Sequence, residues 1–258
     1  MQAGAGLLEP YSSIGLTFGS GLTRQFYFRS KTSDDAVIKQ ILVDHQYDLR
    51  RLPRSPELAE FIGRRRQETG KRPLVVDAGA NIGASAVFFV SSIPDAFVVA
   101  VEPEFENFNL LKRNVENLDV APIKAAISSA HGRARVLDPG LSHWGYRTEN
   151  VADDATSRDS VARLTINDIY LDHAERCFPF IVKIDIEGGE AELFSGDTEW
   201  VECTPLLIIE LHDWLLPKSG NSRSFLQCVS RLDRDFMYLG EDVYSIANDL
   251  DDAGAAGR

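Results

Sequence analysis

The stretch VVDAGANIG, residues 75–83, decides the fold of this chain. An apolar run ends at Asp77, a turn that contains Gly79 and Gly83 follows, and a helix-like segment begins at Ala84. This order predicts a strand, a tight glycine turn and the start of a helix. Backbone N–H groups and glycines without a Cβ let a ligand approach such a turn closely. We therefore expect the turn to hold a small molecule.

Strand-like and helix-like segments alternate from Pro73 onward and predict an α/β fold. The expected strands are residues 74–77, 97–101, 123–127, 180–185 and 206–211, with an edge strand at 133–137 and a final antiparallel hairpin at 236–239 and 243–247. The expected helices are residues 84–92, 104–117, 189–194 and 224–232. Repeated strand–helix units imply a parallel sheet with helices on both faces, and ligands bind at the carboxyl ends of its strands.

We expect one main domain, residues 71–248, and an N-terminal extension, residues 21–70, that packs on it. The extension is expected to contain a strand at 22–28 and helices at 33–42 and 55–70. The segments expected to lack regular structure are residues 1–20, 138–160 and 249–258. A loop as long as the second of these is often functional in a compact domain.

The composition is that of an acidic globular protein. The 258 residues include 39 acidic side chains against 27 lysines and arginines, so the formal net charge is −12. Such a surface repels nucleic-acid phosphates and anionic lipids, which favours a small-molecule substrate over nucleic acid or a membrane. Cys177, Cys203 and Cys228 form no metal-binding spacing, and scattered thiols of this kind are typical of a cytoplasmic protein. We find no signal-peptide pattern and no run near the roughly 20 apolar residues that span a bilayer.

Four of the expected strands end in an acidic residue, and these residues are Asp77, Glu102, Asp185 and Glu210. A single acid in such a place has a structural explanation, because acids are favoured at the N-terminus of a following helix. Four acids at the same edge of one sheet are less easily explained in this way. They favour a functional site at that edge.

The spacing of Glu102 indicates an adenosine ligand. It follows Gly83 by 19 residues, a position from which a carboxylate accepts hydrogen bonds from ribose hydroxyls. A dinucleotide turn has the pattern Gly-x-Gly-x-x-Gly, but here three residues separate Gly79 from Gly83 and the middle glycine is absent. Asp77 before the turn also disfavours a phosphate and favours a cation. S-adenosylmethionine, which carries a sulfonium and an ammonium group but no phosphate, therefore fits better than NAD.

Three motifs resemble the FkbM family of S-adenosylmethionine-dependent methyltransferases, namely DAGANIG at residues 77–83, VEPEFEN at 101–107 and KIDIEGGE at 183–190. The resemblance extends from about residue 30 to about residue 247. It implies the class I, Rossmann-like methyltransferase fold, with a seven-stranded, mostly parallel sheet whose C-terminal hairpin contributes one antiparallel strand. It also implies methyl transfer, usually to a hydroxyl or carboxyl of a natural product or sugar, with N-methylation of a small molecule or peptide as the alternative.

The resemblance further implies which residues contact the cofactor, and these are Asp77, Gly79, Ala80, Asn81, Gly83, Glu102, Pro103, Asn107, Ala126, Ile127 and Asp185. The turn would line the methionine part, with Asp77 holding either the turn or the amino group. Glu102 would bind the ribose, residues 126–127 would flank the adenine, and Asp185 would lie near the methyl group. Asn107 would hold the start of the second helix.

Methyl transfer from a sulfonium is an in-line displacement, so the enzyme has to position two groups and exclude water. A hydroxyl acceptor also has to lose a proton, and a positioned base contributes about 10²- to 10⁴-fold. Our candidates are Asp185 and His212, with Glu210 orienting them or sharing the role. The ordinary pKa of a histidine suits a base, and His212 is expected on the same strand face as Glu210. A structural role for His212 stays open, as does a catalytic role for His143.

Asp185, Glu210 and His212 could instead bind a divalent metal, although nothing in their spacing requires one. Trp144 and Trp214 could cover an apolar substrate, but each one alone is expected to pack in the core or in a lid. Two other function classes stay open, an NAD-dependent oxidoreductase and a non-catalytic ligand-binding module. The methyl acceptor and the oligomeric state, with a homodimer as one option, are not determined by the sequence.

Overall fold

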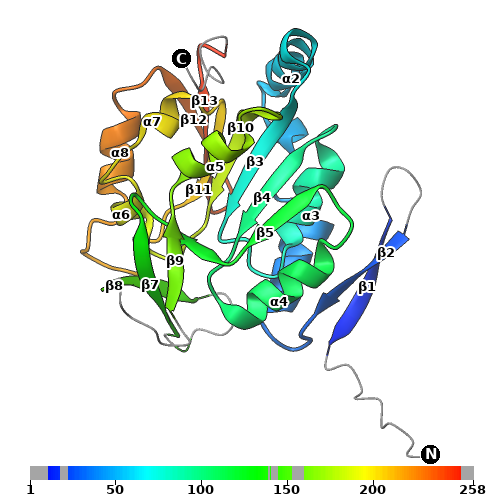
Figure 1. The fold of residues 1–258 in the computed structure, drawn as a ribbon, viewed down its shortest axis with the longest axis vertical. Coiled ribbons are helices and arrows are strands. Elements are labelled where there is room, and N and C mark those ends of the chain that lie inside the picture. Colours follow the sequence, from blue (N-terminus) through cyan, green and yellow to red (C-terminus); the bar gives the residue numbers. More distant parts are fainter. Residues whose placement is uncertain (1–10, 18–22, 139, 141–144, 153–159, 251–258) are drawn as a thin grey trace, which may run out of the picture.

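The computed structural model describes residues 11–17, 23–138, 140, 145–152 and 160–250. Within these residues, seven strands form the central sheet in the order β12-β13-β11-β10-β3-β4-β5 (Figure 1). They are β3 (Arg72–Ala78), β4 (Phe97–Val101), β5 (Val120–Ile123), β10 (Cys177–Ile184), β11 (Leu206–Glu210), β12 (Arg234–Leu239) and β13 (Asp242–Ala247). Neighbours pair in parallel except at β13, which is antiparallel to β11 and β12. The predicted α/β sheet, with one antiparallel strand from the C-terminal hairpin, is confirmed.

The middle of the sheet is built from uninterrupted apolar runs. β10 is buried along its whole length, and β3 is buried from Pro73 to Ala78. Such runs are typical of parallel strands that are covered on both faces. Because side chains alternate along a strand, Val75 packs in one apolar cluster while Leu74 and Val76 pack in the cluster on the opposite face.

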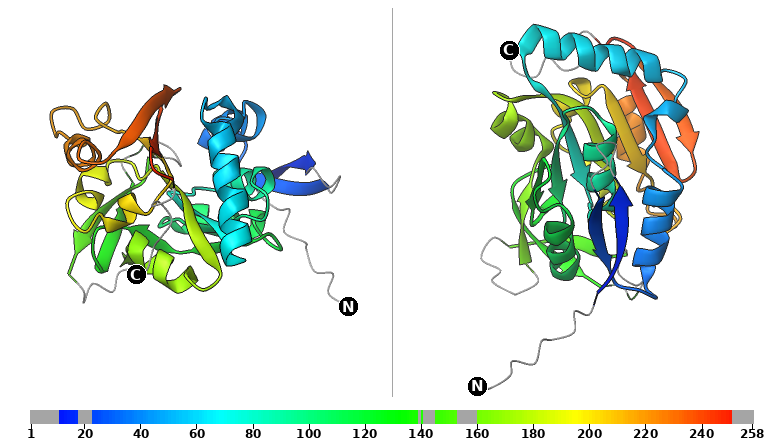
Figure 2. Two further views of the ribbon diagram at one scale, coloured as in Figure 1. Left: turned by 90° about the horizontal axis from the view of Figure 1, so that it is seen from above. Right: turned by 90° about the vertical axis from the view of Figure 1, so that its right-hand side faces the viewer.

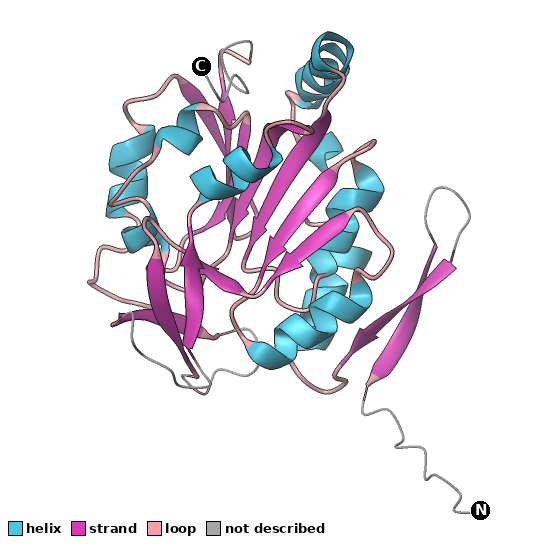
Figure 3. Ribbon diagram, in the orientation of Figure 1, coloured by secondary structure: helices cyan, strands magenta, loops and turns pink. Residues whose placement is uncertain are grey.

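Helices cover both faces of the sheet (Figure 3). One face carries α1 (Ser33–Ile38), α2 (Ser55–Thr69), α3 (Ala84–Ser92) and α4 (Phe105–Asn114), and the other carries α5 (Ile166–His173), α6 (Glu190–Leu193), α7 (Glu199–Glu202) and α8 (Arg223–Val229). The helix predicted at 33–42 is α1 followed by a π-helical segment (Lys39–Val43), and a 3-10 turn (Leu49–Arg51) precedes α2. None of the helices in the described part of the chain has the length and apolar content to cross a membrane.

A second sheet, which the sequence did not predict, lies beside the main one. Its order is β6 (Ala125–Ile127), β9 (Ser160–Leu164), β7 (Gly132–Leu137) and β8 (Arg147–Val151). The single strand predicted at 123–127 is wrong, because the chain leaves the main sheet at Lys124 while the apolar run continues. The prediction that residues 138–160 form a loop is wrong for residues 147–151, which form β8. β8 is a polar edge strand and therefore has no apolar alternation to reveal it.

The N-terminal extension begins with a hairpin of β1 (Ser12–Thr17) and β2 (Thr23–Phe28) at one edge of the molecule (Figure 2). The expectation that residues 1–20 lack regular structure is therefore wrong for β1. Its apolar residues, Ile14 and Leu16, alternate and pack against the core, but the glycine and serine residues around them obscure the pattern. β2 contributes the buried side chains of Phe26 and Phe28.

Asn114, at the end of α4, ties this hairpin to the glycine turn. Its Oδ1 accepts a hydrogen bond from the N–H of Tyr27 at 2.7 Å, and its Nδ2 donates to the carbonyls of Tyr27 at 2.9 Å and Ile82 at 2.8 Å. The side chain is buried. An amide satisfies both a donor and two acceptors here, which an apolar side chain does not.

We expect Asn114→Ala to lower the free energy of unfolding by about 1–3 kcal/mol, because it leaves buried backbone groups without a partner. Urea denaturation followed by circular dichroism measures the change. Asn109→Ala, an exposed position on the same helix, is the matched control and should stay within about 0.5 kcal/mol of the unmodified protein. Equal effects of the two substitutions would contradict the role given to Asn114.

Candidate active site

Backbone hydrogen bonds to the neighbouring strand hold the turn after β3. The N–H groups of Gly79 and Ala80 both donate to the carbonyl of Val101 at 3.0 Å. Gly79 has a φ of +77°, and a Cβ there would lie 1.8 Å from the carbonyl oxygen of Asp185. Only glycine therefore allows the ends of β3 and β10 to come this close.

A pocket of about 390 Å³ opens beside this turn, at the carboxyl ends of β4, β10 and β11. Its volume lies in the range of small-molecule sites. Most of the predicted cofactor residues line it, namely Gly79, Ala80, Asn81, Glu102, Pro103, Asn107, Ala126, Ile127 and Asp185. The structure thus brings these residues together at the edge of the sheet where the sequence predicts a ligand.

Asp77 and Gly83, the other two predicted cofactor residues, are buried behind the pocket and do not line it. Asp77 holds the turn, because its Oδ2 accepts a hydrogen bond from Ser85 Oγ at 2.6 Å. Gly83 has a φ of +90°, and a Cβ there would lie 2.8 Å from a methyl carbon of Leu111. Both residues shape the turn from within.

Lys183 connects the turn to the acids after β10. Its Nζ donates to the carbonyl of Gly79 at 2.8 Å and lies 3.3 Å from Asp77 Oδ1 and 3.4 Å from Asp185 Oδ2. Burial alone would lower the pKa of Lys183, but the charges of Asp77 and Asp185 raise it above its ordinary value. The lysine is therefore a buried cation that links the ends of β3 and β10.

Glu102 sits at the end of β4 as predicted, with its carboxylate fixed by the backbone. Oε2 accepts from the N–H of Asn81 and Oε1 from the N–H of Glu104, both at 2.9 Å. Burial raises the pKa of Glu102 to about 7, although the two hydrogen bonds oppose the shift. The side chain is thus oriented before any ligand binds.

Asn107 lies in the first turn of α4 and lines the pocket. The start of α4 is capped by Glu104, whose Oε2 accepts from the N–H of Asn107 at 2.7 Å. The Oδ1 of Asn107 instead accepts from the guanidinium of Arg29 at 2.6 Å. Arg29 in turn pairs with the buried Asp34 at 2.9 Å, so this chain of contacts joins the pocket to α1.

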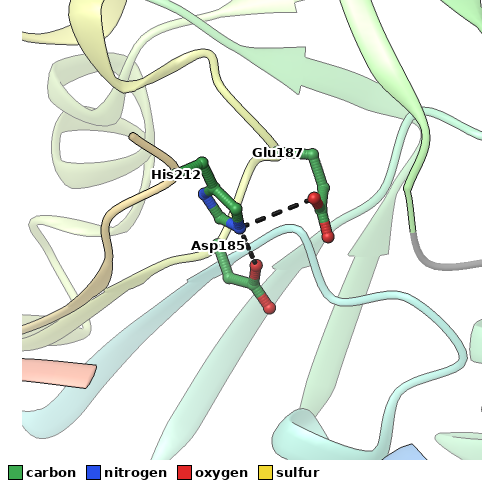
Figure 4. A group of neighbouring side chains, drawn as sticks. All are labelled: Asp185, Glu187 and His212. Carbon is green, nitrogen blue, oxygen red and sulfur yellow. Dashed lines mark ion pairs between the residues drawn. The ribbon is translucent and has the colours of Figure 1, made fainter. Parts of the chain in front are cut away.

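The acidic side of the pocket surrounds one imidazole (Figure 4). The Nε2 atom of His212 lies 3.7 Å from Asp185 Oδ1, 3.5 Å from Glu187 Oε2 and 3.4 Å from Glu210 Oε1. β11 ends at Glu210, so His212 comes from the following turn and not from the strand as predicted. The three predicted catalytic residues, Asp185, Glu210 and His212, nevertheless lie together.

The other side of the imidazole is fixed by a buried carboxylate. Nδ1 of His212 lies 2.8 Å from Glu190 Oε1, and the side chains of both residues are almost fully buried. The amide of Asn221 donates to the second oxygen of Glu190. Glu190 therefore sets the orientation of the His212 ring and directs Nε2 toward the pocket acids.

Mutual proximity and burial shift the pKa values of this cluster. Burial alone would lower the pKa of His212, but the hydrogen bond to Glu190 and the charges of Asp185 and Glu187 raise it to about 9. Burial, with the nearby charge of Asp185, raises the pKa of Glu187 to about 7 and that of Glu210 to about 8. His212 thus carries a proton at neutral pH, so the ordinary histidine pKa assumed from the sequence does not apply.

Sequence reasoning assigned no role to Lys183, Glu187 or Glu190, although all three belong to the KIDIEGGE motif. The motif could have identified these residues as part of the site, because its acids follow the predicted fourth strand. Trp214 is 69% exposed and borders the pocket, with its ring centroid 6.1 Å from that of His212, so it does not pack in the core, and of the two predicted places only the lid stays open. His143 and Trp144 lie outside the described residues.

Comparison with known proteins identifies relatives along most of the chain. The chain is 23% identical over 217 residues to methyltransferase sdnD of Sordaria araneosa, an alignment that covers 72% of this chain and 77% of that protein. It is 27% identical over 154 residues to hexuronic acid methyltransferase AglP of Haloferax volcanii, with 59% and 61% covered. Both proteins are methyltransferases by name.

Two solved structures illustrate the more distant matches. An O-methyltransferase from Bacillus cereus has a TM-score of 0.39 at 10% identity and covers 84% of this chain and 98% of that chain. Monomeric WbdD has a TM-score of 0.39 at 11% identity, and the match covers 75% of this chain but 40% of that longer chain.

A sequence match identifies the protein family of this chain. Residues 77–237 match the model described as the methyltransferase FkbM domain. This match spans more than half of the chain, begins at the glycine turn and includes the acids after β10 and β11. The chain belongs to the FkbM family and is an S-adenosylmethionine-dependent methyltransferase.

Proposed function

We propose that this methyltransferase transfers the methyl group of S-adenosylmethionine to a hydroxyl oxygen of a small natural product or sugar. The main support is that the glycine turn and the acids after β10 and β11 line the same pocket. Asp185 belongs to both halves, because Lys183 lies on one side of its carboxylate and His212 on the other. Cofactor and acceptor would thus meet in one pocket.

The turn side of the pocket fits S-adenosylmethionine. Asn81 Oδ1 is buried there without a hydrogen-bond partner, so it can accept from the ammonium group. Glu102 borders the same pocket, and each carboxylate oxygen keeps a lone pair for a ribose hydroxyl. Ala126 and Ile127 offer apolar surface for the adenine. These residues would hold the cofactor.

When bound, the cofactor supplies a methyl group on a cationic sulfur, which keeps the bonding electron pair after the transfer. The chain itself has to hold the acceptor hydroxyl and take its proton. Glu210 lines the pocket, and a pKa of about 8 suits a base that works near neutral pH. We assign the base role to Glu210 and hydroxyl binding to Asp185. His212 is buried beside both and acts as a positioning residue.

The name of one relative and the charge of the chain indicate the class of the acceptor. AglP is named for methyl transfer to hexuronic acid, a sugar acid, and this supports a sugar as the acceptor here. A net charge of −12 favours a small molecule over nucleic acid. An amine is the second candidate, because acidic side chains also attract a protonated amine. The family assignment lends no support to an oxidoreductase or to a non-catalytic module.

The proposal predicts that the protein labels hydroxylated sugars or natural products when it is supplied with methyl-¹³C S-adenosylmethionine. Carbon NMR of the products distinguishes a methyl ether from an N-methyl group. Formation of methyl ethers supports the proposal, whereas exclusive labelling of amines would replace it with the second candidate. The same panel without protein is the control for spontaneous methylation.

Gly79→Ala is expected to weaken binding of S-adenosylmethionine by about tenfold or more, since the added Cβ has to displace the Asp185 backbone. Isothermal titration calorimetry measures the affinity, and circular dichroism checks the fold. Gly63→Ala is the matched control, because a Cβ there meets no atom within 4 Å. Unchanged affinity in folded Gly79→Ala would show that the turn does not hold the cofactor.

The base assignment predicts that kcat rises with pH, is half-maximal at about pH 8 and levels above it, because only the carboxylate form of Glu210 accepts a proton. Glu210→Gln should lower kcat by about 10²- to 10⁴-fold and remove this rise. The measurement is release of S-adenosylhomocysteine across the pH range. Glu175→Gln, at an exposed acid before the amino end of β10 and away from the pocket, should keep the rise. A Glu210→Gln protein with an unaltered pH profile would refute the assignment.

A further inference from the structure

Three side chains at the acidic end of the pocket are arranged as the ligands of a divalent cation would be. Asp185, Glu187 and His212 each offer one ligand atom, and these atoms lie within 4.8 Å of one another. Within this set, His212 Nε2 lies 3.7 Å from Asp185 Oδ1 and 3.5 Å from Glu187 Oε2. Adjacent ligands of a six-coordinate ion with bonds near 2.1 Å are about 3 Å apart. Small side-chain movements would therefore close the site.

The orientation of His212 supplies independent support. Its side chain is 1% exposed, and Nε2 has no hydrogen-bond partner although it points at two carboxylates (Figure 4). The opposite nitrogen, Nδ1, is held at 2.8 Å by Glu190. A carboxylate that binds one ring nitrogen and leaves the other for a metal is the usual second shell of a ligating histidine. Asn221 fixes Glu190 in turn.

The local charge balance also favours a cation. The carboxylates of Asp185, Glu187, Glu190 and Glu210 all lie within 4 Å of the imidazole of His212. The nearby Lys183 is already shared with Asp77. Carboxylates that outnumber their cationic partners in a partly buried site are commonly paired with a metal. A divalent ion at Nε2 would neutralise this excess and would take the place of the proton there.

We propose that Asp185, Glu187 and His212 bind a divalent cation, and Mn²⁺ is the probe for the site because two of the three ligands are carboxylates, which suit this ion. The site differs from the one considered from the sequence, because Glu187 takes the place of Glu210 as a ligand. Its role rests on the proposed function: the free coordination positions would hold two neighbouring oxygens of the acceptor, such as those of a vicinal diol. Glu210, 3.4 Å from Nε2, would then accept the proton of the bound hydroxyl.

Electron paramagnetic resonance of Mn²⁺ added to the full chain, without cofactor or acceptor, tests the site directly. We expect one ion per chain, seen as loss of the free Mn²⁺ signal. Glu187→Gln and His212→Gln should each weaken binding by about tenfold or more. Glu175→Gln, which removes the same charge from an exposed position away from the pocket, should bind as the unmodified protein does. Absence of binding, or equal binding by the two ligand variants and the control, would overturn the proposal.

A second arm separates this proposal from the proposed function. Calorimetry with S-adenosylmethionine and the ¹³C labelling assay are repeated after treatment with a chelator and again after Mn²⁺ is restored. Labelling that stops with the chelator and returns with Mn²⁺ supports the metal site. Hydroxyl labelling that persists without metal overturns the role of the ion in holding the acceptor and leaves the proposed function intact. His212 is buried, so Glu187→Gln, at a side chain 19% exposed, supplies the result if His212→Gln does not fold.

Discussion

The buried ammonium group of Lys183 is the contact on which both halves of the site depend. It donates to the Gly79 carbonyl and lies between Asp77 and Asp185, and its side chain is 3% exposed. Removing one partner from a buried ion pair costs about 3–5 kcal/mol, because the other charge is left uncompensated. The lysine therefore holds the cofactor turn and the first acid of the pocket in one fixed relation.

The two sides of the pocket differ in charge. The turn side offers backbone groups, one carboxylate fixed by two N–H donors, and apolar walls, which suit an adenosyl ligand without phosphate. The far side gathers acids around His212, and Glu190 sets the orientation of its ring. Burial raises the pKa of carboxyl groups on this side, so that a fraction of them is protonated near neutral pH. A carboxylate such as Glu210 is therefore a stronger base than that of an ordinary glutamate.

Much of this arrangement could be predicted from the sequence, because it depends on local patterns. The apolar runs of β3 and β10 and the glycine turn gave the parallel sheet, and acids at strand ends indicated the edge that carries the pocket. The second sheet could not be predicted, since β6 continues the apolar run of β5 and β8 is polar. The protonation state of His212 could not be predicted either. Its pKa depends on Glu187 and Glu190, whose side chains come together only in the folded chain.

We propose that one pocket holds the cofactor at the turn and the acceptor at the acids, with Asp185 between them. A crystal structure of the chain with bound S-adenosylhomocysteine tests it most directly. The account predicts ribose hydroxyls within hydrogen-bond distance of Glu102 and the sulfur atom directed toward Asp185 and Glu210. A ribose held by other side chains, or a sulfur atom that faces away from these acids, would contradict it.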